Sequence, residues 1–289
     1  MNMTFVRDGK GISMRKLHQV AAAVGAGVLS AGILYGTGVA GADTGPHGHP
    51  GSEPENIGLL VGQIDDYYGA HQAADGTWEA SPDSPYAHDL ARIEAGAKRD
   101  IARATAGHGH GRDQGGHGGH ASHKKPAIVL DVDDTALLSF TYERATHYVY
   151  DDATWNAFVS KADRPAVYGM PGLVSYAKDH GVAVFFVTGL AEDLREPAVL
   201  NLKATGYDTP LDRAHLFTKD KANPPAYLGD CATAAAWNCT TVQFKSATRE
   251  HIEADGYDII GNFGDQQSDL TGGHADHAYK LPNPTYFVQ

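Results

Sequence analysis

Short apolar runs alternate with amphipathic segments in residues 126–289. Apolar runs of about four to six residues are typical of strands buried on both faces in a parallel sheet. The amphipathic segments predict helices, and Gly181, Gly206 and Gly256 follow three of them, where glycine often ends a helix. Ser246 suits the N-cap of the last one. The predicted strands are 127–130, 182–187, 216–217 and 257–260, and the predicted helices are 172–180, 194–205 and 246–255.

The alternation of strands and helices predicts an α/β fold with a doubly wound parallel sheet. Ligands of such sheets bind beyond the carboxyl ends of the strands. The residues that directly follow each predicted strand are therefore the first candidates for chemistry.

The preceding segment, residues 43–106, predicts a partly helical extension. Apolar residues recur at helical spacing in two pieces between positions 57 and 104, and a turn-rich stretch at 81–85 separates them. Residues 107–125 are rich in glycine and histidine and predict a disordered linker or loop. Two interpretations of this run stay open, transition-metal binding and a solvated spacer. Its histidines are His108, His110, His117, His120 and His123.

Residues 1–42 have the pattern of a signal peptide. Arg15 and Lys16 precede an uncharged stretch, and Ala40-Gly41-Ala42 offers a small-residue cleavage site. We expect a protein that is secreted, or held in the cell envelope, and that has no membrane segment after cleavage. An uncleaved membrane anchor is the alternative.

The net charge and the cysteines limit the classes of binding partner and the cellular compartment that we expect. The formal net charge of -12 argues against a nucleic-acid partner. The only two cysteines are Cys231 and Cys239. In an exported protein they are expected to form a disulfide, whereas two free thiols would be the alternative.

Carboxylates gather after two of the predicted strands. Asp131 and Asp133 follow the first strand in the sequence DVDDT, and Asp265 and Asp269 lie in GDQQSD after the last one. Crowded carboxylates need a cation or shared protons, and Mg²⁺ is a hard cation that prefers oxygen ligands. Ordinary acidic turns with local hydrogen bonds are the alternative at each place.

A hydroxyl and a lysine complete the candidate set. Thr188 ends the second strand, and its hydroxyl and the amide of Gly189 are suited to a phosphate oxygen. Lys245 precedes the last predicted helix, where a cation opposes the helix dipole, so phosphate binding or plain surface exposure would explain it.

In this order the motifs resemble those of the haloacid-dehalogenase (HAD) superfamily. The segments PGLVSYAKDHGVAVFFVTG, FKSATREHIEADGYDIIGNFGDQQSDL and YKLPNP are similar to the branch with class B-type acid phosphatases and plant vegetative storage proteins. The resemblance covers residues 126–289. It favours Lys245 as the phosphate lysine over Lys219 or Lys221, and it departs from the branch at Leu190, where arginine is frequent.

The resemblance implies a phosphatase acting on small phosphomonoesters through an aspartyl-phosphate. Asp131 would be the nucleophile and Asp133 the acid and base, while Thr188 and Lys245 would stabilise the transferring group. Mg²⁺ would be bound by Asp131, Asp133, Asp265 and Asp269. The aromatic-rich segment 137–170 would form a small cap over the site. A phosphotransferase, or a non-catalytic storage or metal-binding protein on the same fold, remains an alternative.

Overall fold

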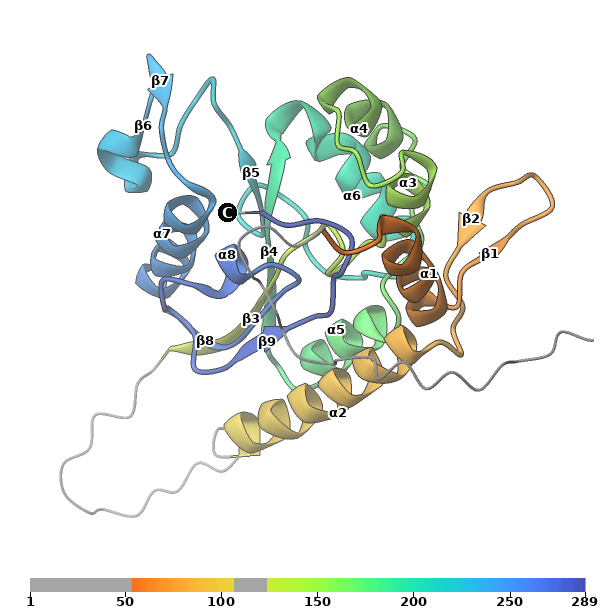
Figure 1. The fold of residues 1–289 in the computed structure, drawn as a ribbon. Coiled ribbons are helices and arrows are strands. Elements are labelled where there is room, and N and C mark those ends of the chain that lie inside the picture. The colour runs from red at the N-terminus through yellow and green to blue at the C-terminus, as the bar shows by residue number, and fades with distance from the viewer. Residues whose placement is uncertain (1–53, 107–123, 289) are drawn as a thin grey trace, which may run out of the picture. The chain divides into compact units, whose positions relative to one another are not determined.

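The computed structural model describes residues 54–106 and 124–288 and centres on a five-stranded sheet (Figure 1). All neighbouring strands are parallel, in the order β5-β4-β3-β8-β9. The α/β parallel fold is therefore confirmed. The predicted signal peptide and the five histidines of the glycine-rich run lie outside the described residues. The strands are β3 (Lys125–Leu130), β4 (Ala183–Ala191), β5 (Leu216–Lys219), β8 (Tyr257–Gly264) and β9 (Ala278–Lys280).

Side chains of the central strand β3 alternate between two hydrophobic cores. Ile128 and Leu130 belong to the larger core, whereas Ala127 and Val129 belong to the smaller one on the opposite face. Because successive side chains of a strand point to opposite faces, a continuous apolar run needs cover on both. This explains why the strands appear in the sequence as unbroken apolar runs.

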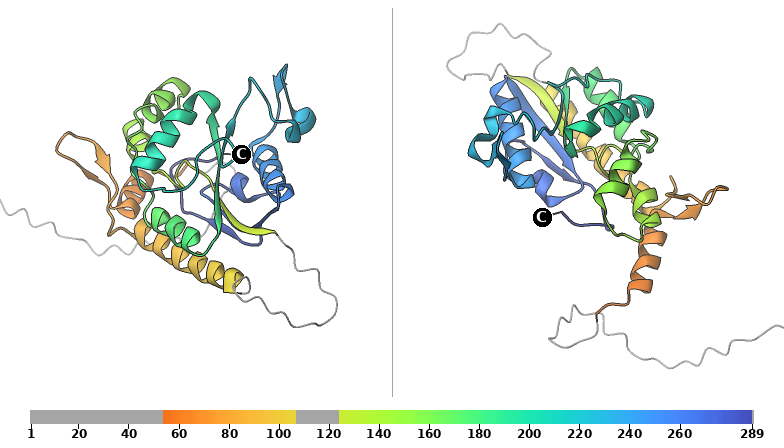
Figure 2. Two further views of the ribbon diagram at one scale, coloured as in Figure 1. Left: turned by 180° about the vertical axis from the view of Figure 1, so that it is seen from behind. Right: turned by 90° about the horizontal axis from the view of Figure 1, so that it is seen from above.

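Helices supply that cover (Figures 1 and 2). The larger core takes apolar residues from α5 (Met170–Asp179) and α6 (Arg195–Ala204), which follows the short 3-10 helix η1 (Glu192–Leu194). The smaller core takes Phe244 and Ile252 from α7 (Thr241–Ala254). The sheet is thus covered by helices on both faces, as the doubly wound prediction requires.

The segment before the sheet is also part of the larger core. It comprises α1 (Ile57–Tyr68), a hairpin of β1 (His71–Gln72) and β2 (Trp78–Glu79), and α2 (Pro85–Ala106). The α2 residues Tyr86, Leu90, Ala97 and Ile101 are buried there beside strand residues. The hairpin was not predicted, because its two-residue strands carry no apolar periodicity.

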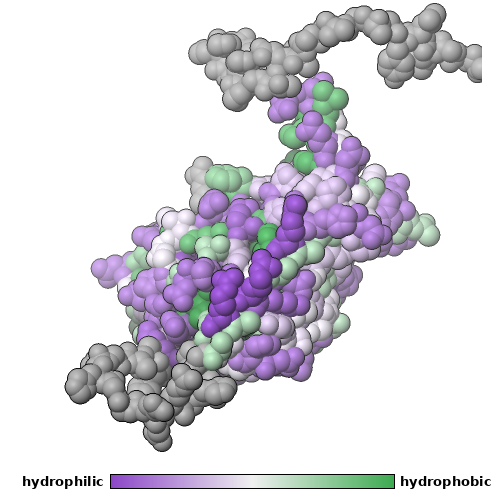
Figure 3. Space-filling view, turned by 90° about the horizontal axis from the view of Figure 1, so that it is seen from below, coloured by the Kyte–Doolittle hydropathy of each residue, from purple (hydrophilic) through white to green (hydrophobic). Residues whose placement is uncertain are grey.

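The surface seen in Figure 3 is mostly hydrophilic. Apolar residues that remain exposed include Ile57, Leu59 and Leu60 on α1. Among the described residues, none of the helices combines the length and apolarity that crossing a membrane would require.

Helix α7 begins earlier than the sequence predicted. Its N-cap is Thr240, whose hydroxyl accepts from the Gln243 amide at 3.1 Å while the Gln243 side chain accepts from the Thr240 amide at 2.9 Å. This reciprocal capping box fixes the start of the helix. The prediction of Ser246 as N-cap was wrong, since its hydroxyl donates back to the Val242 carbonyl at 2.7 Å within the helix. Lys245 therefore lies inside α7.

Residues 137–170 contain two short helices, α3 (Phe140–Ala145) and α4 (Asp152–Val159). Their aromatic rings pack mainly on one another. The Tyr142 ring lies 5.1 Å from that of Trp155 and 5.2 Å from that of Phe158, between centroids. Most of these aromatics are therefore part of the larger core, and the Phe140 ring also stacks on that of Tyr68 in α1, with centroids 4.4 Å apart.

Cys231 and Cys239 form a disulfide, with their Cα atoms 4.7 Å apart. It closes the loop that holds β6 (Ala232–Thr233) and β7 (Ala236–Trp237), between η2 (Ala226–Cys231) and α7. Both cysteines pack against the smaller core.

Replacing both cysteines with serine is expected to lower the free energy of unfolding by about 2–3 kcal/mol, because the cross-link restricts the unfolded chain. Urea unfolding measures this. Reductant should destabilise the wild type but not the double variant, which is the control. Equal stability of the two proteins without reductant would contradict the expectation.

Candidate active site

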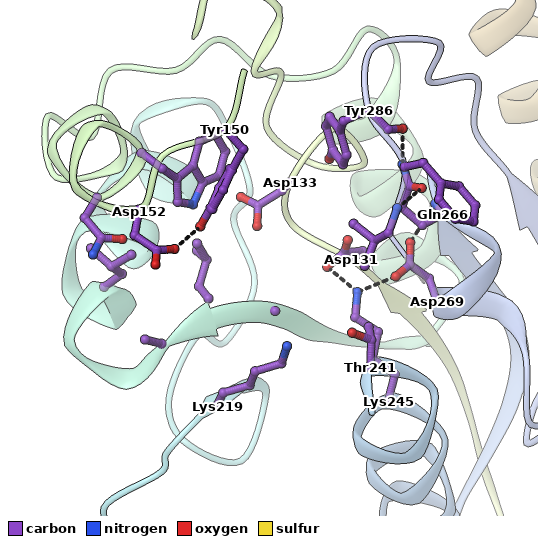
Figure 4. A pocket seen from close by; sticks show the side chains of 18 of the residues that line it. Asp131, Asp133, Tyr150, Asp152, Lys219, Thr241, Lys245, Gln266, Asp269 and Tyr286 are labelled. Carbon is purple, nitrogen blue, oxygen red and sulfur yellow. Dashed lines mark hydrogen bonds and ion pairs between the residues drawn. The ribbon is translucent and has the colours of Figure 1, made fainter. Parts of the chain in front are cut away.

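Three buried carboxylates meet where β3 and β8 end, and Figure 4 shows two of them, Asp131 and Asp269. Asp131 directly follows β3, Asp265 directly follows β8, and Asp269 lies on the short helix α8 (Gln267–Leu270). One carboxylate oxygen from each lies within 4.8 Å of the others. Only glycine fits at position 264, because an added Cβ would lie 2.3 Å from the Asp269 Cβ. Adjacent parallel strands thus bring together acids that are far apart in sequence.

Lys245 neutralises part of this charge. Its Nζ lies 2.8 Å from Asp131 Oδ1 and 2.6 Å from Asp269 Oδ1, and the side chain is buried. Burial alone would lower the pKa of the Lys245 ammonium, but the charges of Asp131 and Asp269 outweigh it and raise the pKa. Burial raises the pKa of Asp131; Lys245 opposes this effect, and the neighbouring carboxylates add to it.

The donor set fits a divalent hard cation. When all three carboxylates are ionised, they and the one ammonium leave two negative charges in a buried site, and every candidate ligand atom is oxygen. Mg²⁺ would balance that charge, and it prefers oxygen ligands.

Neighbouring side chains orient the acids. Asp265 Oδ2 accepts from Gln266 Nε2 at 2.7 Å and from Asn283 Nδ2 at 2.8 Å, and Asp265 Oδ1 accepts from the Thr135 hydroxyl at 3.2 Å. Burial raises the pKa of Asp265, and the bonds from Asn283 and Gln266 lower it in part. Hydrogen-bonded carboxylates of this kind hold a fixed orientation toward a metal.

Arg249 holds the loop that carries Asp269. Its guanidinium donates to the carbonyls of Asp269, Thr271 and Gly273 at 2.7, 2.7 and 2.9 Å. Burial lowers the pKa of Arg249 to about 10. One buried side chain thereby fixes three backbone groups around α8.

Asp133 has a different environment from Asp131. Its Oδ1 accepts from Arg164 Nη1 at 2.6 Å, and its Oδ2 accepts from the Thr188 hydroxyl at 3.4 Å. The Arg164 side chain is completely buried, and its backbone is bonded to the Asn201 amide on both sides. Asp133 thus has its own cation, while Asp131 shares Lys245 with Asp269.

A cavity of about 820 Å³ opens above these groups. Asp131, Asp133, Lys245 and Asp269 form its base, and side chains of α3, α4 and the C-terminal segment form much of its walls (Figure 4). Lys219 also lines it, and burial followed by the charges of Lys245 and Lys221 lowers the pKa of Lys219. The remaining wall residues include Glu143, Tyr148, Tyr150, Asp152, Trp155, Leu190, Lys221 and Tyr286.

The structure brings the candidate residues together in one place. Asp131, Asp133, Asp265, Asp269, Thr188 and Lys245 all lie around the base of the cavity. Lys245, rather than Lys219 or Lys221, contacts the Asp131 carboxylate.

Several residues of the site were not found from the sequence, among them Arg164, Glu143 and Tyr286. Arg164 and Glu143 come from the segment between β3 and α5, and Tyr286 comes from the C-terminal segment. None of the three directly follows a predicted strand or belongs to a motif. For Arg164 and Glu143, the available signal was a charged residue within an aromatic-rich segment.

Several known proteins are similar in sequence to part of this chain. The stem 28 kDa glycoprotein of Glycine max is 32% identical over 174 residues, covering 58% of this chain and 62% of the relative. Acid phosphatase 1 of Solanum lycopersicum is 30% identical over 164 residues, covering 55% and 58%. Vegetative storage protein 1 of Arabidopsis thaliana is 29% identical over 164 residues, covering 55% and 54%. The chain thus spans less than two thirds of these relatives' length.

Among solved structures, the class C acid phosphatase from Bacillus anthracis aligns with a TM-score of 0.48 and 18% identity, covering 68% of this chain and 78% of that one. The family model described as HAD superfamily, subfamily IIIB (acid phosphatase) matches residues 112–289, more than half of the chain. The protein therefore belongs to subfamily IIIB of the HAD superfamily, the acid phosphatases.

Proposed function

We propose that this protein is a secreted, Mg²⁺-dependent acid phosphatase that hydrolyses phosphate monoesters through an aspartyl-phosphate. The observation that carries the proposal is the buried group of Asp131, Asp265 and Asp269 around Lys245 at the base of an open cavity. Membership of an acid phosphatase family supports it. A storage role alone would not require this costly concentration of buried charge.

In the first step, a carboxylate oxygen of Asp131 attacks phosphorus. The bond between phosphorus and the ester oxygen breaks, and that oxygen leaves with the electron pair and takes a proton from Asp133. Asp133 lies beside Thr188 and is oriented by Arg164, as a positioned acid must be. Lys245 and Thr188 stabilise negative charge on the transferring group.

In the second step, the Asp133 carboxylate accepts a proton from water while the water oxygen attacks phosphorus. The bond from phosphorus to Asp131 breaks, which releases phosphate and restores both carboxyl groups to their starting states. Asp131, the Asp133 backbone carbonyl, Asp265 and Asp269 would hold Mg²⁺, directly or through water at Asp269, and the bound cation would offset repulsion between the Asp131 carboxylate and the phosphate anion.

Residues 126–289 would form the phosphatase domain, and residues 137–170 its cap. Helices α3 and α4 of that segment contribute Glu143, Asp152 and Trp155 to the cavity wall, which supports this assignment. Export is supported by the N-terminal sequence pattern and by the disulfide. Some relatives are glycoproteins by name, which agrees with this compartment.

The proposed function is tested by hydrolysis of p-nitrophenyl phosphate across acidic to neutral pH. We expect removal of divalent cations with EDTA to lower turnover by about 10³-fold or more, because a metal supplies several kcal/mol of charge stabilisation, and Mg²⁺ should restore it. Turnover that is indifferent to EDTA would contradict the metal assignment.

Absence of turnover under all these conditions would favour the storage or binding alternative. Transfer of phosphate to an added alcohol such as glycerol, in preference to water, would instead indicate a phosphotransferase.

A further inference from the structure

One carboxyl group in the cavity wall has no partner. Glu143 lies on α3, is only 4% exposed and lines the cavity above Asp131 and Asp133. Its side chain makes no hydrogen bond or ion pair within the described residues. Burial raises the pKa of Glu143 to about 7. A mostly buried carboxylate without a partner is costly, so a bound group that donates to the Glu143 carboxylate would be favoured at this wall.

The nearest cation in sequence is already engaged. Arg144 Nε and Nη2 lie 2.8 and 3.0 Å from the two carboxylate oxygens of Asp65, and the guanidinium stacks 4.3 Å from the Trp78 ring. It therefore serves the contact between α3 and the N-terminal segment, and the Glu143 carboxyl is left facing the cavity.

Tyr148, which follows α3, carries a second unpartnered polar group. The Tyr148 hydroxyl is fully buried without a hydrogen-bond partner in the described residues, and Tyr148 lines the same cavity. The Tyr148 amide donates to the Glu143 carbonyl at 2.8 Å, which fixes the two residues together. His147 and Tyr148 both have positive φ, 55° and 61°, an unusual conformation for bulky residues.

The other acids that line the cavity already have an ion-pair or hydrogen-bond partner. Lys245 forms ion pairs with Asp131 and Asp269, and Arg164 forms one with Asp133. Asp152 accepts from the Tyr150 hydroxyl at 2.8 Å. Among the acids that line the cavity, Glu143 is thus the one without a partner in the described residues, and a positively charged donor would complement its carboxylate best.

We infer that Glu143 and Tyr148 form a leaving-group subsite for an ammonium group, so that the preferred substrates are phosphate monoesters of amino alcohols. This inference rests on the proposed function. The phosphate of such an ester would lie at Asp131, and its ammonium would face the Glu143 carboxylate, with Tyr148 in the same wall. The rings of Tyr150 and Trp155 in the same wall add favourable faces for a cation.

Two esters of equal chain length test the subsite: 2-aminoethyl phosphate ends in an ammonium, and 2-hydroxyethyl phosphate ends in a neutral hydroxyl. We expect the wild type to favour the amino ester in kcat/KM by about tenfold or more, as buried charge pairs discriminate strongly. Glu143→Gln should bring the ratio close to one, and Tyr148→Phe should lower it less. Glu196→Gln, exposed on α6, is the matched control and should keep the wild-type ratio. A wild-type ratio near one would overturn the inference.

Equilibrium binding separates this inference from the proposed function. Calorimetry with the full-length Asp131→Asn variant should show about tenfold tighter binding of the amino ester than of the hydroxy ester, and adding Glu143→Gln should remove the difference. Preferential binding without any wild-type hydrolysis would uphold the subsite and refute the phosphatase. Equal binding of both esters, together with hydrolysis of p-nitrophenyl phosphate, would refute the subsite and uphold the phosphatase.

Discussion

Asp131→Asn is expected to lower kcat for p-nitrophenyl phosphate by about 10⁴-fold or more, the range seen when a covalent nucleophile is removed. The amide keeps the shape of the side chain but cannot form the phosphoryl ester. The fold should persist, because the substitution removes one of three crowded carboxylates while Lys245 keeps its pair with Asp269 at 2.6 Å. Steady-state kinetics and thermal unfolding measure the two effects.

Asp179→Asn, on the exposed end of α5, is the matched control and should retain wild-type turnover.

A second comparison uses Asp133→Asn. Because p-nitrophenol leaves without needing a proton, this variant should still form the phosphoenzyme but hydrolyse it slowly, whereas Asp131→Asn should form none. Acid quenching with a radiolabelled ester separates the two. Residual turnover within tenfold of wild type in Asp131→Asn would exclude Asp131 as the nucleophile.

Lys245→Met is expected to lower both stability and activity. In the metal-free protein it leaves Asp131 and Asp269 buried without their cation, which should reduce the free energy of unfolding by about 3–5 kcal/mol. The loss should shrink in Mg²⁺, because a bound divalent cation replaces part of the missing charge. Activity should fall by about 10³-fold, since the lysine faces the transferring group.

Urea unfolding in EDTA and in Mg²⁺ tests this expectation. Lys203→Met, exposed near the end of α6, is the matched control and should change stability by less than about 0.5 kcal/mol. If Lys245→Met is as stable as the wild type in EDTA, the lysine is not the charge that holds the acids together.

Most of the sheet, and the carboxylates at the bottom of the cavity, could be predicted from the sequence for one physical reason. Strands buried on both faces are unbroken apolar runs, and residues after such strands must meet at one edge of the sheet. Asp131 and Asp265 follow two such runs, so their proximity was predictable. β9 was not, because its three residues have no apolar pattern.

The cavity walls could not be predicted in the same way. Arg164 reaches Asp133 because its backbone is bonded to Asn201 on α6, a contact between residues far apart in sequence. Glu143 faces the cavity because of how α3 lies, and no local pattern distinguishes it from a solvent-exposed acid. The start of α7 was missed for a local reason, since Thr240 and Gln243 cap the helix before Ser246 can.

The α2 residues Tyr86, Leu90, Ala97 and Ile101 are buried in the larger core. The folded segment therefore begins earlier in the chain than the segment that the family model matches. The stretch shared with the family begins at residue 112, after α2 has ended. A recombinant fragment cut at that family boundary would lose α2 and expose the part of the larger core that α2 covers. The segment that the family model matches is therefore shorter than the segment that packs around the sheet, and an expression fragment or chimaera should start no later than α1, whose Ile64 and Tyr68 are also in the larger core.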